Sequence, residues 1–168
     1  ALALSGVTAV ATPWTDHVDS AEGLRAYPLV LGVLVWGYHR DHDRWIKATS
    51  GWAEAGISLA NPATVLGWNS DKAYLGRLAE RGVAIPPTLW TDQVVEADIE
   101  AAFERFGAAQ LVIKPTVSGG AYRTLKLARG EAFDAGAAPI GAAMIQPYLP
   151  LRYTTSYKTF FSSVLKSF

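Results

Sequence analysis

The chain has 168 residues, half of them hydrophobic, and its 15 basic and 15 acidic residues give a formal net charge of zero. This balance excludes intrinsic disorder, which needs low hydrophobicity and high net charge, and disfavours a nucleic-acid partner, which needs a strongly basic surface. The sequence has no cysteine, which excludes disulfide bonds, thiolate zinc sites, iron–sulfur clusters and a cysteine nucleophile. A chain of this length is expected to form one domain, or two small ones, with a hydrophobic core.

Residues 1–36 carry two apolar stretches. Residues 1–11 lack the positively charged start of a signal peptide, and their β-branched part, 7–11, ends before Pro13. The longer run, Leu29–Trp36, is far below the ~20 residues that cross a bilayer, and its aliphatic character predicts a strand buried on both faces, as in a parallel sheet. We therefore expect no membrane partner and, given the lack of cysteine, a cytoplasmic protein. Because the chain does not begin with methionine, we expect it to be processed, trimmed or only partly represented.

An amphipathic helix and another strand follow. The helix is expected to start at Asp41 or Asp43, to end at Gly56, and to bury two tryptophans at helical spacing, Trp45 and Trp52. The short run 57–60 predicts a strand. This alternation of strands and helices is typical of an open α/β layer.

Two further helices and a strand are expected between residues 69 and 107. The first helix follows three N-capping residue types in a row, at 69–71, and ends at Gly82. The next apolar run, 83–88, predicts an edge strand because a Pro pair interrupts it. The second helix covers 98–106 and ends at Gly107.

The remaining pattern predicts three strands. Leu111–Pro115 and Tyr122–Leu127 are expected to form a hairpin joined by the loop 116–121, and Ala142–Tyr148 predicts the last strand.

Lys114 and the loop that follows it form the most informative motif. Ser118, Gly119 and Gly120 give the loop a hydroxyl and two glycines, so its backbone N–H groups can approach an anion closely, and the strand-end lysine supplies a positive charge. The same residues are also typical of a plain hairpin whose lysine buries its aliphatic stem. The motif alone leaves both interpretations open.

The order of several motifs resembles the ATP-grasp superfamily, and within it the glutathione-synthetase-like carboxylate–amine ligases. The resemblance extends from about Asn61 to Leu149. It rests on a lysine-bearing helix start, a Gly-Val-Ala-Ile-Pro-Pro-Thr strand, a Val-Ile-Lys-Pro strand, the Ser-Gly-Gly loop and a Gln-Pro-Tyr-Leu hinge, at 69–72, 82–88, 112–115, 118–120 and 146–149. It implies an α/β fold with an N-terminal open α/β domain, a small α+β nucleotide-binding domain and the remnant of a C-terminal domain, at 1–62, 63–149 and 150–168.

The resemblance implies ATP and Mg²⁺ as cofactors. Lys114 would contact the α- and β-phosphates, and Lys72 would line the same cleft. The loop would cover the γ-phosphate through three residues, Ser118, Gly119 and Gly120.

The adenine side of the cleft is implied at the last strand. Gln146 would face the adenine amino group, and Tyr148 and Leu149 would form the hinge backbone. The implied activity is that of an ATP-dependent ligase, which activates a carboxylate as an acylphosphate for attack by an amine-type nucleophile. The partner would be a small carboxylate or amino-acid-like substrate, and a homodimer is one candidate assembly. The alternative is a noncatalytic nucleotide-binding or scaffold module whose lysines are surface charges.

Two segments depart from the family pattern. The loop 118–124 differs from the more usual Ala-Gly-rich version, which suggests a specialised ligase that closes a small amino-acid-derived ring in antibiotic biosynthesis, of the D-cycloserine synthetase type. Residues 150–168 contain no Asp, Glu, Asn or Gln, where family members carry metal-binding residues. We therefore identify no metal ligand and no catalytic residue, and we expect a truncated or gapped version of a larger enzyme.

Other candidate sites have simpler interpretations. His39 and His42 are spaced to share a helix face and so to bind a metal, but an exposed polar turn before the next helix explains them as well. Trp36 and Tyr38 follow the long aliphatic run, where open α/β sheets bind ligands, and they also fit core packing. The sequence has no dinucleotide-binding glycine motif after a strand and no P-loop lysine.

Overall fold

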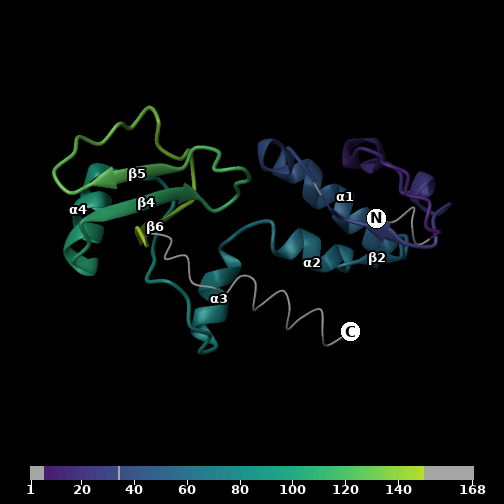
Figure 1. Ribbon diagram of the computed structural model, residues 1–168, viewed down its shortest axis with the longest axis horizontal. Coiled ribbons are helices and arrows are strands. Elements are labelled where there is room, and N and C mark those ends of the chain that lie inside the picture. Colours follow the sequence, from purple (N-terminus) through teal and green to yellow (C-terminus); the bar gives the residue numbers. More distant parts are fainter. Residues whose placement is uncertain (1–5, 34, 150–168) are drawn as a thin grey trace.

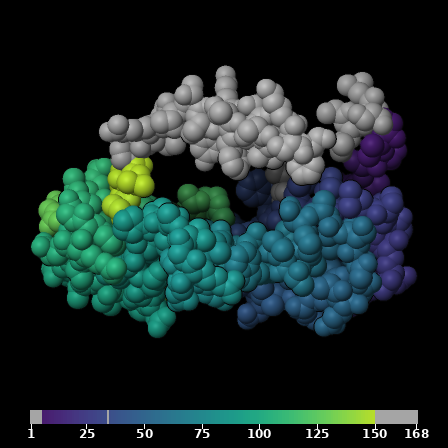
Figure 2. Space-filling model, turned by 90° about the horizontal axis from the view of Figure 1, so that it is seen from below, coloured from purple at the N-terminus to yellow at the C-terminus, as the bar shows by residue number. Residues whose placement is uncertain are grey.

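The computed structural model describes residues 6–33 and 35–149. These residues form two lobes (Figure 1). The N-terminal lobe contains, in chain order, η2 (Trp14–His17), η3 (Glu22–Leu24), β1 (Val30–Leu31), η4 (Tyr38–Arg40), α1 (His42–Glu54), β2 (Leu59–Ala60) and α2 (Ala63–Trp68). The second lobe contains α3 (Tyr74–Glu80), β3 (Leu89–Thr91), α4 (Glu96–Phe106), β4 (Gln110–Pro115), β5 (Leu125–Ala128) and β6 (Ala143–Pro147). Figure 2 shows the same division, with the teal residues around α2 and α3 running between the lobes. Within the described residues, no helix is long and apolar enough to cross a membrane.

Tryptophan side chains form the centre of the N-terminal lobe. α1 begins at His42, between the two predicted starts, and Asp41 caps it: its carboxylate accepts a hydrogen bond from the Arg44 backbone N–H at 3.3 Å. Trp45 and Trp52 are both buried and meet edge to face, with ring centroids 5.6 Å apart. The prediction that these two tryptophans belong to the core is confirmed.

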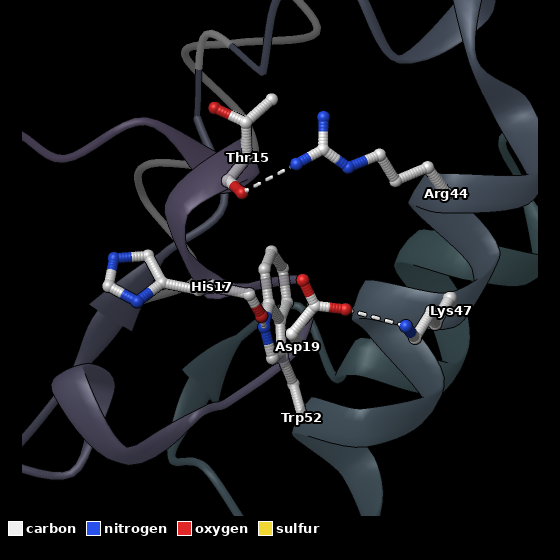
Figure 3. A network of polar contacts seen from close by, with 6 residues as sticks. All are labelled: Thr15, His17, Asp19, Arg44, Lys47 and Trp52. Carbon is white, nitrogen blue, oxygen red and sulfur yellow. Dashed lines mark hydrogen bonds and ion pairs between the residues drawn. The ribbon is translucent and has the colours of Figure 1, made fainter.

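Polar contacts fasten the segment before β1 to α1. Figure 3 shows Arg44 donating to the Thr15 carbonyl (3.2 Å), Trp52 donating to the His17 carbonyl (2.8 Å), and Lys47 paired with the Asp19 carboxylate (2.6 Å). The hydrogen bond from Lys47 is the main reason why the pKa of Asp19 lies below its ordinary value. Because each contact joins the same two segments, the network holds the lobe together.

The expected strand at Leu29–Trp36 is mostly absent. Only Val30–Leu31 pairs, in parallel with Leu59–Ala60. This pairing confirms the strand predicted within 57–60 and the parallel direction of the two strands. The side chains of Val33 and Trp36 are 64% and 72% exposed, so the prediction of a strand buried on both faces is wrong for the described part of the run. Burial on both faces needs neighbouring strands and covering helices, and β1 has a single partner strand among the described residues.

The second lobe is a four-stranded antiparallel sheet in the order β3-β6-β4-β5, with α4 against one face. α4 ends as predicted at Gly107, whose backbone is left-handed at φ 57°. Residues along β4 alternate between buried and half-buried, and the buried ones pack with the apolar face of α4: Leu111 and Ile113 with Ile99, Ala102 and Phe103. The predicted hairpin is confirmed, because β4 pairs with β5 in antiparallel register, although its second strand begins at Leu125 and not at Tyr122.

Two elements differ from the sequence-based expectation. The strand predicted at 83–88 lies instead at Leu89–Thr91, since Pro86 and Pro87 have no N–H to donate to a neighbouring strand. α2 was not predicted, and no side-chain cap marks its start. The predicted remnant at 150–168 lies outside the described residues.

Candidate nucleotide-binding site

The sheet of the second lobe has one face that α4 does not cover. Residues that pair directly across neighbouring strands share a face, so the alternation of β4 places Val112 and Lys114 opposite the α4 side. Gln146 pairs with Val112, and Met144 of β6 lies between Lys114 of β4 and Trp90 of β3. This second face, which we call the lysine face, therefore carries Trp90, Val112, Lys114, Met144 and Gln146.

Lys72 comes to the same region from the turn between α2 and α3. Its backbone N–H donates to the Thr116 carbonyl at 2.9 Å, which places it beside the end of β4. Its side-chain Nζ donates to the carbonyls of Thr116 (3.3 Å) and Ser118 (2.8 Å). The structure thus brings together the two lysines that are far apart in the sequence.

The two lysines form a partly desolvated cationic pair. Burial lowers the pKa of Lys114, and burial together with the nearby Lys114 charge lowers the pKa of Lys72. Asp71 opposes this shift only weakly, as the smallest of the three influences on Lys72. In the described part of the chain, neither Lys72 nor Lys114 forms an ion pair with a carboxylate; the cations that do are Arg25, Lys47 and Arg129. A pair of half-buried cations without a paired carboxylate favours an anionic ligand.

The loop after β4 folds tightly next to this pair. Gly120 and Ala121 both have φ of 60°, and Tyr122 and Thr124 donate backbone hydrogen bonds to Gly119 (3.1 Å) and Ala121 (3.0 Å). A left-handed backbone is costly for a residue other than glycine, so Ala121 marks local strain in this loop.

Loop residues with left-handed or closely packed backbone commonly surround ligand sites. Ser118 is buried, and its hydroxyl points into the loop, towards the Tyr122 carbonyl at 3.4 Å. Gly119 and Gly120 are the next two residues of this loop.

The predicted hinge lies at the far end of the lysine face. Gln146 is buried and donates from Nε2 to the Thr88 hydroxyl oxygen at 2.8 Å, which fixes the orientation of its amide. Tyr148 continues the sheet by donating its backbone N–H to the Gln110 carbonyl at 2.8 Å, and Leu149 is exposed.

Sequence reasoning missed three residues of this site. Thr88 orients Gln146, and the only signal for it was its place after the Pro pair. The Lys126 ammonium lies 3.9 Å from the centroid of the Tyr148 ring, a cation–π contact that the alternation of β5 did not reveal. Trp90 joins the lysine face through its register with Met144, which only the sheet order determines.

Of the other candidates from the sequence, Tyr38 and His39 reach the loop of this site, at Ser118 and Gly119. No group of three or more metal-ligating side chains forms among the described residues, and His42 instead meets Ser70 (2.8 Å). Trp36 is largely exposed, whereas Tyr38 packs on Trp45 with ring centroids 5.7 Å apart. The open hollows between α1 and α2 lie in the N-terminal lobe, away from the lysine face.

Comparisons with known proteins place this arrangement in a known fold. No family model matches the sequence, and no curated protein matches it significantly. The crystal structure of D-cycloserine synthetase DcsG matches with a TM-score of 0.65 at 20% identity, covering 88% of this chain and 52% of that one. D-alanine-D-alanine ligase from Helicobacter pylori (TM-score 0.49, 16% identity, 74% of this chain and 39% of that one) and the ATP-grasp ligase PsnB complexed with minimal precursor (0.42, 22%, 72% and 44%) also match.

The match to D-cycloserine synthetase establishes the fold of this chain. The described residues have a mixed α/β architecture that resembles part of D-cycloserine synthetase, in agreement with the predicted α/β fold. The chain spans about half the length of that enzyme.

Proposed function

We propose that this chain binds ATP as part of an ATP-dependent carboxylate–amine ligase. The observation that carries the proposal is the cationic pair Lys72 and Lys114, half-buried beside a tight glycine-containing loop on the face of the sheet opposite α4. Phosphoryl transfer depends mainly on positioning and on neutralising the charge of the phosphates, which is the chemistry that such a pair supplies.

The proposed roles follow the positions of the residues along the lysine face. Lys72 and Lys114 would bind the phosphates at one end, with the loop residues Ser118, Gly119 and Gly120 over the terminal phosphate. At the other end the adenine would lie near the hinge residues, Gln146, Tyr148 and Leu149. The order along β4 and β6 supports this arrangement, because Lys114 and Gln146 share a face and are offset along neighbouring strands.

Bound ATP would supply the phosphoryl group that turns a carboxylate into an acylphosphate, which an amine-type nucleophile then attacks. The fold match to D-cycloserine synthetase supports a small amino-acid-like substrate, and we propose an intramolecular ring closure as the specific reaction. A ligand set for Mg²⁺ does not fit the described residues, which contain no cluster of metal-ligating side chains, so we assign the metal no residue and no step.

Isothermal titration of ATP into the full chain, with and without Mg²⁺, tests the proposal. Lys114→Ala should weaken ATP binding about 10-fold to 100-fold, because a hydrogen bond to a charged group contributes about 1.5–3 kcal/mol. Lys47→Ala is the matched control, since this lysine pairs with Asp19 on the N-terminal lobe. The absence of ATP binding, or an equal loss in both variants, would contradict the proposal.

The alternative that the sequence leaves open is a nucleotide-binding module without catalysis. The two candidates differ in turnover: a ligase releases ADP when ATP meets a suitable amino-acid-like substrate, and the module binds ATP and releases none. For this chain we expect binding with little turnover. Measurable ADP release would show that the chain carries a complete catalytic site.

A further inference from the structure

The loop beside the lysine pair is in contact with a corner of the N-terminal lobe, η4. The carbonyl of Ser118 accepts two hydrogen bonds, one from Lys72 Nζ at 2.8 Å and one from the Tyr38 hydroxyl at 3.2 Å. Burial raises the pKa of Tyr38, so its hydroxyl remains a donor across the neutral range. One carbonyl of the loop is therefore fixed from two directions, by residues 34 positions apart in sequence.

His39 contacts the next residue of the loop. A Cβ atom at Gly119 would lie 3.0 Å from His39 Nδ1, so the ring is in close contact with the glycine and would have to shift slightly to admit a larger residue. The same ring lies 5.0 Å, centroid to centroid, from the ring of Tyr122, which stands between the left-handed residues Ala121 and Arg123. Tyr38 and His39 thus contact the loop on both sides of its turn.

The charges around His39 are consistent with a packing contact. The groups that face it are Arg40, Lys72 and the Tyr122 ring. Burial, and then the positive charges of Arg40 and Lys72, lower the pKa of His39, which favours the neutral form of the ring. A neutral ring packs on the loop without adding a third charge to the lysine pair.

The position of η4 is set by the core of the N-terminal lobe. The Tyr38 ring packs on Trp45, which is 1% exposed and belongs to the centre of that lobe. A displacement of this core would therefore move Tyr38 and, through it, the Ser118 carbonyl.

We propose that Tyr38 and His39 are positioning residues that hold the loop after β4 over the lysine pair. Through them, the N-terminal lobe would control recognition of the terminal phosphate. This inference rests on the proposed function for the identity of the ligand, a nucleoside triphosphate. Because the loop is expected to contact the third phosphate, loosening it should weaken ATP more than ADP.

Hydrogen exchange of residues 116–124 in the nucleotide-free chain tests the contact itself. Tyr38→Phe should speed exchange of the loop amides severalfold, while melting shows that the variant is folded. Tyr27→Phe is the matched control, because Tyr27 is a partly exposed residue after η3 and should leave the loop unchanged. Unchanged exchange in Tyr38→Phe would overturn the inference, whether or not the chain binds ATP.

Binding of ATP and ADP tests the consequence. Tyr38→Phe and His39→Ala should lower the ratio of ATP affinity to ADP affinity about threefold to tenfold, as expected for the loss of one contact. His39→Gln should lower the ratio less than His39→Ala does, because it keeps a neutral polar side chain of similar reach. An equal loss of affinity for ATP and for ADP would show that Tyr38 and His39 have only a structural role, and it would also overturn the inference. A wild-type chain that binds neither nucleotide would refute the proposed function, and the exchange result would still decide whether Tyr38 holds the loop.

Discussion

The two lobes use their sheets differently. In the second lobe, four antiparallel strands give a sheet with one face buried against α4 and another that lines up Lys114, Gln146 and Trp90. In the N-terminal lobe, a pair of two-residue strands leaves aliphatic side chains such as Leu31 and Val33 exposed, and aromatic packing around α1 forms the core. A binding surface needs adjacent strands that place alternate residues side by side, and only the second sheet is wide enough to do so.

The lobes also differ in how they contribute to the candidate site. Their hydrophobic clusters contain separate sets of residues. The contacts near the site that lie outside both clusters are the hydrogen bonds of Tyr38 with Ser118 and of His42 with Ser70, and the packing of the His39 ring on Tyr122. The second lobe therefore supplies the binding face, and the N-terminal lobe contributes through one corner. This division predicts that damage to one core leaves the other core folded.

The largest effect is expected for Trp45→Ala in the N-terminal lobe. Truncating this 1% exposed side chain should cost about 3–5 kcal/mol, because it removes the contact surface shared with Trp14, Tyr38 and Trp52. Hydrogen exchange should show lost protection in α1 and retained protection in α4. Trp36→Ala, at an exposed side chain, is the control and should change stability by less than about 0.5 kcal/mol. Equal loss of protection in α4 would show that the lobes fold as one unit.

Ile113→Ala should have the next largest effect, in the second lobe. Ile113 is fully buried between the sheet and α4, and its truncation should cost about 2–5 kcal/mol in urea unfolding. Val112→Ala is the matched control, because its half-buried side chain lies on the lysine face and should cost clearly less. Similar losses in the two variants would mean that the lysine face is packed as tightly as the α4 face.

Sequence patterns predicted the elements whose signals are local. Asp41 marks the start of α1 through its own hydrogen bond, Gly107 marks the end of α4 through its left-handed backbone, and β4 shows its alternation directly. The run Leu29–Trp36 was misjudged because the burial of an aliphatic strand depends on partners that other parts of a chain provide. The motif order also placed Lys72 and Lys114 in one site, and the structure does bring them together.

Contacts between lobes could not be predicted from the sequence. The hydrogen bond from Tyr38 to Ser118 joins residues 80 positions apart, and neither residue carries a local pattern that points to the other. Thr88 and Gln146 are similarly 58 positions apart, and they meet because β3 and β6 pair. The roles assigned to the site residues stay predictions that the binding experiments test.

The pH dependence of stability should separate the lysine face from the surface of the N-terminal lobe. Because burial lowers the pKa of Lys114 in the folded state, the unfolded state holds its proton to higher pH, and the free energy of unfolding should rise as the pH approaches the ordinary lysine pKa of about 10.4. Lys114→Met should therefore be more stable than the wild type at pH 7, and this advantage should shrink by pH 9.5. Urea unfolding at both pH values measures it. Lys47→Met, which breaks an exposed ion pair, should show no such gain at pH 7, and a gain there would contradict the assignment of the effect to burial.

The smallest effects are expected for the left-handed glycines that follow α1 and α4, one in each lobe. Gly56 follows α1 with φ of 65°, Gly107 follows α4 with φ of 57°, and a Cβ at either position would meet no atom within 4 Å. Substitution by alanine should therefore cost only the strain of a left-handed backbone, about 1 kcal/mol at each site. Hydrogen exchange should place the loss in α1 for Gly56→Ala and in α4 for Gly107→Ala. The local strain is similar at the two sites, so each substitution should reduce hydrogen-exchange protection in its own helix. If protection is also lost in the helix of the other lobe, the size of that loss measures how strongly the contacts around Tyr38 and Ser118 couple the lobes.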